Sequence, residues 1–181
     1  DTANRTNPVD GTIVMSNLCS EILQVQQPSL LNDKQEYEVL GTDISCNLGS
    51  TNIPNLMKSP DFGKSVETMV RALTYVTDHS SIDAVPTIKN GNDQAHTIGL
   101  GGMGLHTMFA TNQMHYGSPE SIEFTDIYFM LLNYYTLAAS NKIAKERGEA
   151  FVNFDKSTYY TGEYFDAYTD SDVVFQSEKV K

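Results

Sequence analysis

A long helix with clear signals at both ends is the sequence feature that most constrains the fold. Ser118 can cap the helix, Pro119 suits the first helical position, and Glu120 places an acidic side chain in the first turn. Gly148 is placed to end it. The sequence therefore predicts a helix over 118–147 that buries one apolar face, formed by Ile127, Leu131, Tyr134 and Ala138.

Two further helices are predicted upstream of this one. Near 63–79, apolar residues recur at steps of three and four positions, as on one buried helix face; they are Val66, Met69, Val70, Leu73 and Val76. A helix near 94–114 is supported by a second apolar set, Ile98, Met103, Leu105, Met108 and Phe109. Four glycines inside 94–114 lower the helix propensity of that segment.

Short β-branched or apolar runs predict strands at 12–15, 22–25 and about 39–46, with an exposed polar connection over 26–38. Helices that follow short strands indicate a mixed α/β fold. With 181 residues, of which 40% are hydrophobic, the chain can bury a core, and we expect one domain over 1–181.

The net charge of −11 argues against broad binding of nucleic acid or of an anionic membrane, because an acidic surface repels both. No apolar run approaches the roughly 20 residues of a membrane span, and the first residues lack the layout of a signal peptide, so we expect a cytoplasmic protein. A chain this acidic would bind a phosphate group through helix N-termini and hydroxyls, or through residues outside this chain.

The run from Ser16 to Ile22 carries the most informative chemistry. In an extended conformation Asn17, Cys19 and Glu21 point to one side of the chain. A nearby carboxylate disfavours a thiolate, and no histidine lies close in sequence, so the pattern does not suit a nucleophilic cysteine. It suits a thiol that exchanges a hydrogen atom beside a carboxylate that takes a proton. The alternative is a polar strand face with one buried cysteine.

Several motifs, in order along the chain, resemble one family. The run N-L-C-S-E-I at 17–22 resembles the finger-loop signature of ribonucleotide reductase large subunits, and D-I-S-C-N-L-G-S at 43–50 is similar to a segment of that family with a redox-active cysteine. The separation of Cys19 and Cys46, 27 positions, fits class Ib. The similarity covers essentially the whole chain through H-T-I-G-L-G (96–101), H-Y-G-S-P-E (115–120), A-S-N (139–141) and G-E-Y-F-D (162–166).

The resemblance implies a role for each residue of the finger loop near 16–22. Cys19 would become the thiyl radical that abstracts the ribose 3′ hydrogen, Glu21 would accept the 3′-hydroxyl proton, and Asn17 would hydrogen-bond the ribose. Cys46 would be one of two thiols that end as a disulfide, with its partner cysteine outside this chain. The substrate would contact the run Asn17, Leu18, Cys19, Ser20 and Glu21.

The resemblance also implies the surroundings of the site. The fold would be part of a ten-stranded α/β barrel with the finger loop at its centre. The chain would be part of a ribonucleoside-diphosphate reductase that makes deoxyribonucleotides for DNA synthesis, and it would be inactive alone. The radical would come from a small subunit with a di-metal (Mn or Fe) tyrosyl-radical centre, and the electrons from a thioredoxin- or glutaredoxin-like protein. The full subunit would form a homodimer and could bind allosteric nucleotides.

Two other functions fit the same residues. A coenzyme-B12-dependent ribonucleotide reductase would use a similar finger loop without a second subunit, and activity that required adenosylcobalamin would favour it. A non-catalytic nucleotide-binding module would bind ribonucleoside diphosphates tightly without turnover.

Three other patterns are weaker. G-L-G-G-M-G at 99–104 matches the dinucleotide fingerprint, but no buried strand is predicted before it, so we expect the close packing of a glycine-rich helix. The four histidines contain no metal-binding pair, and we expect no metal site; they are His79, His96, His106 and His115. For Tyr134-Tyr135 and Tyr159-Tyr160 we expect core packing or surface contact rather than a radical relay.

Overall fold

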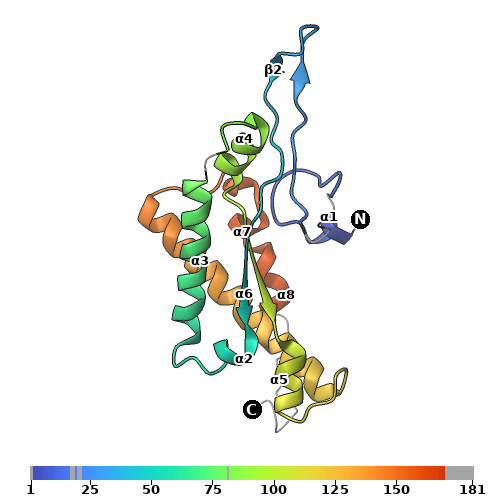
Figure 1. Ribbon diagram of the computed structural model, residues 1–181, viewed down its shortest axis with the longest axis vertical. Coiled ribbons are helices and arrows are strands. Elements are labelled where there is room, and N and C mark those ends of the chain that lie inside the picture. Colours follow the sequence, from blue (N-terminus) through green and yellow to red (C-terminus); the bar gives the residue numbers. More distant parts are fainter. Residues whose placement is uncertain (1, 17–18, 20–21, 81, 170–181) are drawn as a thin grey trace. The chain divides into compact units, whose positions relative to one another are not determined.

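The computed structural model describes residues 2–16, 19, 22–80 and 82–169 (Figure 1). They divide into two compact units: one contains the described residues up to 47, 76–98 and those from 150 onward, and the other contains 48–75 and 99–149. Helices and strands both occur, which confirms the mixed α/β prediction. The four described strands form two separate two-stranded sheets, so no closed barrel is seen in this part of the chain. No described helix is long and apolar enough to cross a bilayer.

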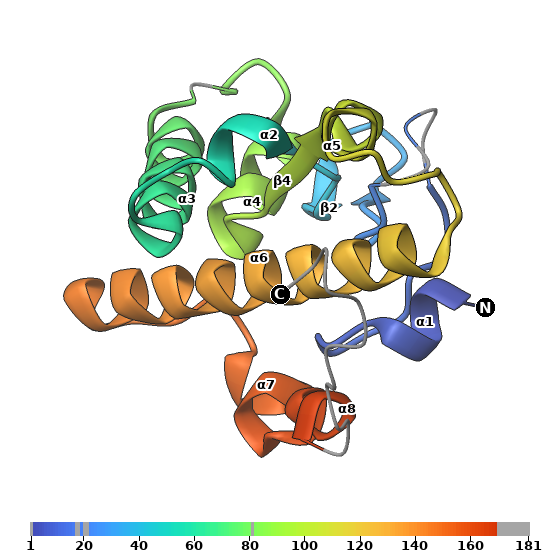
Figure 2. The same cartoon turned by 90° about the horizontal axis from the view of Figure 1, so that it is seen from below.

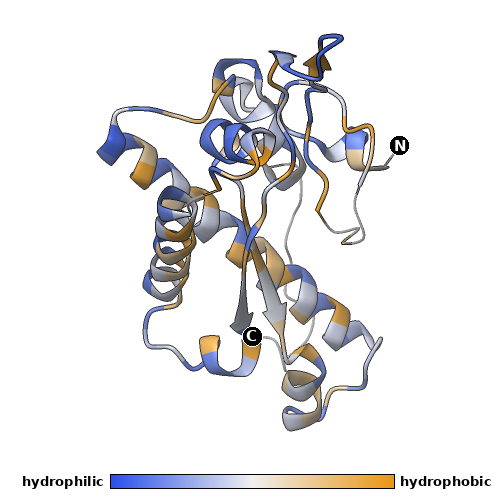
Figure 3. Cartoon of the chain, turned by 45° about the horizontal axis from the view of Figure 1, so that its top comes forward, coloured by the Kyte–Doolittle hydropathy of each residue, from blue (hydrophilic) through white to orange (hydrophobic). Residues whose placement is uncertain are grey.

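The second unit contains most of a parallel strand pair. β3 (Asn47–Asn52) and β4 (Ile98–Met103) are neighbours in one sheet, and their arrows point the same way in Figures 1 and 3. After β3 the chain forms α2 (Ile53–Leu56) and α3 (Phe62–His79). The helices after β4 are α5 (Leu105–Thr111) and α6 (Pro119–Arg147). Figure 2 shows α6 running beside α3, β4 and α5.

The ends of α6 are as the sequence predicts, but its buried face is not. The Ser118 hydroxyl accepts a bond from the Ser121 N–H, and Gly148 ends the helix at φ 74°. The predicted face is wrong, since the side chain of Tyr134 is 63% exposed. The buried side chains are Ser121, Phe124, Tyr128, Leu132 and Ala139. Apolar residues occur all round α6, so its sequence does not single out one face.

Tyr128 anchors α6 to the strand pair. Its hydroxyl lies 2.9 Å from that of Thr51 on β3, and both residues are buried. The Thr51 hydroxyl donates to the Gly101 carbonyl of β4 at 3.1 Å, so Tyr128 is the donor to Thr51. Burial raises the pKa of Tyr128 above its ordinary value. The phenol therefore stays protonated at neutral pH, as this bond requires.

Helix α3 confirms the prediction for 63–79, with one change in its buried stripe. Val66, Val70 and Leu73 are buried, but the next buried residue is Thr77, whereas Val76 is 48% exposed. Residues spaced by four, three and four positions lie on the same face of a helix, and this spacing, counted from Val66, leads to position 77. The buried Thr77 hydroxyl is satisfied by the Asn47 side-chain amide at 2.9 Å.

The predicted helix near 94–114 is wrong. The structure has α4 (Pro86–Ala95), then β4, then α5. Left-handed backbone at His96 (φ 46°) ends α4, and Gly104 (φ 83°) begins α5, which breaks the segment into three elements. The glycines do allow close packing, as predicted, but on a strand: a Cβ on Gly102 would lie 3.2 Å from Ile53 Cδ1.

In the first unit, two predicted strands are absent from the described residues. The N–H and C=O of Ile13 pair with the side-chain amide of Asn4 at 2.8 and 2.9 Å instead of with a second strand. The segment 22–25 also forms no strand. Of the predicted strand at 39–46, only Val39 lies in one, the end of β2. A strand needs a backbone partner, and the local apolar pattern does not reveal which partner is available.

The predicted connection at 26–38 contains a small antiparallel hairpin instead of loop alone. Its strands are β1 (Leu30–Leu31) and β2 (Tyr37–Val39), and its apolar side chains are exposed. Figure 3 shows hydrophobic colour on these strands and hydrophilic colour at the turn between them. The remaining elements of the first unit are α1 (Thr2–Thr6), η1 (Phe154–Lys156), α7 (Thr158–Thr161), η2 (Glu163–Phe165) and α8 (Asp166–Thr169).

Ion pairs link α3 and α6 within the second unit. Glu67 accepts bonds from Lys142 and from Arg71 Nε, both at 2.8 Å, and the Arg71 guanidinium also binds both carboxylate oxygens of Glu146 at 2.7 and 2.8 Å. The bond from Lys142, followed by those from Arg71 and Lys64, lowers the pKa of Glu67 from 4.5 to about 2.

This lowered pKa predicts a loss of stability in acid. A carboxyl group whose pKa is depressed by folding stabilises the fold above pH 4.5, its ordinary value, and this contribution is lost as the pH falls toward about 2. Glu67→Gln should therefore flatten the dependence of the unfolding midpoint on pH between about 5 and 3. Glu149→Gln, which removes a carboxylate outside the network, is the matched control. Equal pH slopes for wild type and Glu67→Gln would contradict the assignment.

Candidate functional site

The two cysteines belong to the first unit, and the structure describes both. Cys19 is exposed, Cys46 is partly buried, and neither forms a disulfide. The other predicted residues of the finger loop lie outside the described residues; they are Asn17, Leu18, Ser20 and Glu21. Their roles therefore remain predictions, and the geometry of the site is built from Cys19, Cys46 and the segments that hold them.

An antiparallel ribbon joins the two cysteine segments. Leu30 is opposite Val39 in the hairpin, and a bridge pairs Gln27 with Thr42. Further along, the Gln24 side-chain amide donates to the Ser45 carbonyl at 2.8 Å. The pairing keeps one register from Leu30–Val39 to Gln27–Thr42, and the bond from Gln24 to Ser45 holds the two segments together beyond it.

Cys19 lies at the same end of this ribbon. The N–H of Ile22 donates to the Cys19 carbonyl at 3.0 Å, a bond between residues three apart that is typical of a turn. Such a bond keeps the two Cα atoms within about 7 Å of one another. Ile22 lies two residues before Gln24, and Cys46 follows Ser45, so the bond between Gln24 and Ser45 brings two cysteines that are distant in sequence to one end of the ribbon.

Helix α4 holds the Cys46 segment from the other side. The Asp43 N–H donates to the Thr87 carbonyl at 3.0 Å, and the Thr87 hydroxyl donates to the Asp43 carboxylate. The Asn90 amide donates to the Gly41 carbonyl at 3.0 Å. The helix comes so close that a Cβ on Gly91 would lie 2.0 Å from the Asp43 carbonyl oxygen. Glycine is therefore required at this contact.

A buried asparagine on α4 binds both neighbours of Cys46. The side-chain oxygen of Asn92 accepts bonds from the Ser45 hydroxyl at 3.1 Å and from the Asn47 amide at 3.4 Å. Its own amide donates to the Thr77 carbonyl at 3.0 Å, and the residue is 2% exposed. This arrangement explains the polar residues at alternate positions of the motif 43–50. The sequence analysis did not predict a role for Asn92, because one amide side chain among the polar residues of α4 forms no recognisable pattern.

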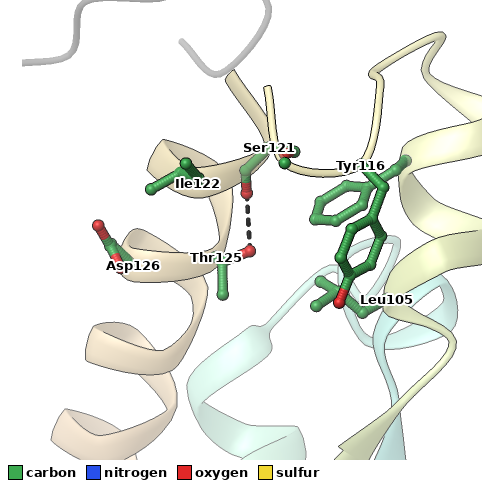
Figure 4. A pocket seen from close by; sticks show the side chains of 8 residues that line it. Leu105, Tyr116, Ser121, Ile122, Thr125 and Asp126 are labelled. Carbon is green, nitrogen blue, oxygen red and sulfur yellow. Dashed lines mark hydrogen bonds between the residues drawn. The ribbon is translucent and has the colours of Figure 1, made fainter. Parts of the chain in front are cut away.

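The second unit has a pocket that neither cysteine lines. It measures about 200 Å³ and lies between α5 and the start of α6 (Figure 4). The Thr125 hydroxyl on its wall donates to the Ser121 carbonyl at 2.7 Å, so that proton is already used by the helix. The full lining is Leu105, Phe109, Tyr116, Gly117, Ser121, Ile122, Thr125 and Asp126. None of these is a predicted site residue. In the described part of the chain, no three His, Cys, Asp or Glu residues are grouped to hold a metal.

Known proteins resemble the chain along its whole length. The model of the family described as ribonucleotide reductase, barrel domain, matches residues 1–181. The ribonucleoside-diphosphate reductase subunit alpha of Mycoplasma pneumoniae is 42% identical over 182 residues, which cover 100% of this chain and 25% of that protein. The protein of the same name from Bacillus subtilis is 43% identical over 168 residues, 93% of this chain and 24% of the relative. The chain thus spans about a quarter of the length of these relatives.

Proposed function

Because the chain belongs to the ribonucleotide reductase barrel-domain family, we propose that it is part of the catalytic α subunit of a ribonucleoside-diphosphate reductase. The observation that carries the proposal is the ribbon that brings Cys19 and Cys46 to one end. Conversion of a ribonucleotide to a deoxyribonucleotide replaces C–OH by C–H, which consumes two electrons and two protons and releases water. A radical thiol and a reducing thiol are needed at the same sugar.

The proposed division of labour assigns hydrogen-atom transfer to Cys19 and reduction to Cys46. Cys19, as a thiyl radical, takes the 3′ hydrogen of the ribose and later returns a hydrogen atom. Glu21 accepts the proton of the 3′ hydroxyl, and Asn17 holds the ribose. Cys46 gives its electrons and proton together with a second cysteine outside this chain, and the two sulfurs end as a disulfide. The substrate lies along residues 17–21.

The rest of the proposed enzyme lies outside the chain. The two strand pairs would contribute to a ten-stranded α/β barrel, completed by other parts of a longer polypeptide. A small subunit with a di-metal tyrosyl radical would supply the radical, and a thioredoxin- or glutaredoxin-like protein would reduce the disulfide. The complete subunit would be a cytoplasmic homodimer. Activity that depended on adenosylcobalamin, without a metal subunit, would favour the coenzyme-B12-dependent alternative.

Cys46→Ser in the complete subunit tests the reducing role. Serine cannot form a disulfide, so we expect steady-state deoxynucleotide formation with a dithiol reductant to fall by about a hundredfold or more. Substrate affinity, measured by calorimetry with a ribonucleoside diphosphate, should change little. Leu48→Ser, at an exposed position two residues away, is the matched control. Turnover of Cys46→Ser at the rate of this control would refute the proposed redox role.

A further inference from the structure

Cys46 lies between two residues that are both hydrogen-bonded to the side chain of Asn92. The Ser45 hydroxyl and the Asn47 amide both donate to the Asn92 side-chain oxygen, at 3.1 and 3.4 Å. Cys46 lies between these two hydrogen-bonded residues, directly before β3 begins at Asn47. The two bonds therefore hold the side chains of the residues on both sides of Cys46.

Asn92 is well placed to act as a rigid anchor. Its oxygen has two lone pairs and accepts two bonds, and its amide donates to the Thr77 carbonyl at 3.0 Å. The side chain is 2% exposed, so water cannot replace a lost partner easily. Rotation of the side chain would leave a buried polar group without a partner, and this unfavourable state opposes the rotation. Asn47 adds a further tie, because its amide also donates to the Thr77 hydroxyl at 2.9 Å.

We propose that Asn92 is a positioning residue that sets the place and direction of the Cys46 thiol, an inference that rests on the redox role proposed for Cys46. A disulfide requires a narrow geometry, with Cα atoms usually about 4.4–6.8 Å apart and an S–S distance near 2.05 Å. Misplacement of a reacting group by about 1 Å can cost about a hundredfold in rate. Asn92, which holds the residues on both sides of Cys46, therefore affects the rate of the electron-transfer step.

The inference predicts a kinetic effect that is confined to turnover. Among the described residues, Asn92 bonds to Ser45, Asn47 and Thr77, so its loss acts on the segment that carries Cys46. Asn92→Ala in the complete α subunit, assayed with its radical-generating partner, should lower kcat about tenfold and leave KM unchanged. Alkylation of the Cys46 thiol by iodoacetamide, followed by mass spectrometry, should become several times faster.

Asn90→Ala is the matched control, because it removes the same side chain two positions away on α4. Its amide donates to the Leu40 and Gly41 carbonyls at 3.2 and 3.0 Å, farther along the ribbon from Cys46. Both variants should lower the unfolding midpoint, since both lose bonds between α4 and the ribbon. Only Asn92→Ala should change kcat and the alkylation rate. A kcat of Asn92→Ala equal to that of Asn90→Ala would overturn the inference.

Two additional variants keep the result interpretable. If Asn92→Ala does not fold, Ser45→Ala removes one of the two hydrogen bonds to Asn92 without altering α4. This variant should also lower kcat, by a smaller factor than Asn92→Ala. An unchanged kcat would again overturn the inference. Cys46→Ser is measured alongside. If Cys46→Ser turns over normally, the proposed redox role fails. If Cys46→Ser is inactive while Asn92→Ala keeps its kcat, only the positioning role fails.

Discussion

Cys19→Ser in the complete α subunit is expected to reduce deoxynucleotide formation by about a thousandfold or more. A serine hydroxyl has nearly the shape of the thiol, but its O–H bond is too strong for the radical exchange assigned to Cys19. The structure places Cys19 at an exposed position, so the substitution should cost little stability. The measurement is deoxynucleotide formed per subunit from a ribonucleoside diphosphate, with the radical-generating partner and a dithiol present.

The control for this variant is Ser16→Ala, at another exposed position of the same segment. It should keep nearly full activity. The unfolding midpoints of both variants should stay within about 1–2 °C of the wild-type value, because exposed substitutions change stability by less than about 0.5 kcal/mol. Deoxynucleotide formation above background by Cys19→Ser would rule out the thiyl role, since no other described residue is assigned to hydrogen-atom transfer.

Gly91→Ala is expected to destabilise the contact between α4 and the Cys46 segment by about 2 kcal/mol. Alanine normally stabilises a helix interior by about 1 kcal/mol relative to glycine. Here its Cβ would lie 2.0 Å from the Asp43 carbonyl oxygen and 3.1 Å from the Asp43 carbonyl carbon, so backbone must move. The bond between the Asp43 N–H and the Thr87 carbonyl should open about 30-fold more often, since about 1.4 kcal/mol is a factor of ten.

Hydrogen exchange followed by mass spectrometry on the peptide that contains Asp43 measures this local effect. Gly101→Ala is the matched control, because its Cβ would meet only ordinary contacts, the nearest being Ser50 Oγ at 3.5 Å. The control should leave exchange at Asp43 unchanged. An increase in the protection of Asp43 in Gly91→Ala would show that the helix-propensity effect exceeds the steric clash, and would contradict the close approach of α4.

Local signals in the sequence predicted the two long helices well. Capping and termination depend on residues next to one another, so Ser118 and Gly148 mark the ends of α6 without tertiary information. The periodic apolar residues of α3 predicted its extent for the same reason. The motifs around Cys19 and Cys46 predicted the family, which the comparisons confirm. Residue type and order along the chain were sufficient for each of these results.

The tertiary structure decided the features that depend on a distant partner. The segment 98–103 contains glycines and apolar residues that fit a helix or a strand, and pairing with β3 makes it a strand. The placement of Cys19 and Cys46 at one end of the ribbon depends on bonds such as that between Gln24 and Ser45. The role of Asn92 depends on partners 45 to 47 residues away in sequence. The sequence by itself determined the ends of α6 and the family, because these depend on neighbouring residues and on motif order. Only the fold decided how the segments meet, because hydrogen bonds between distant residues leave no local pattern.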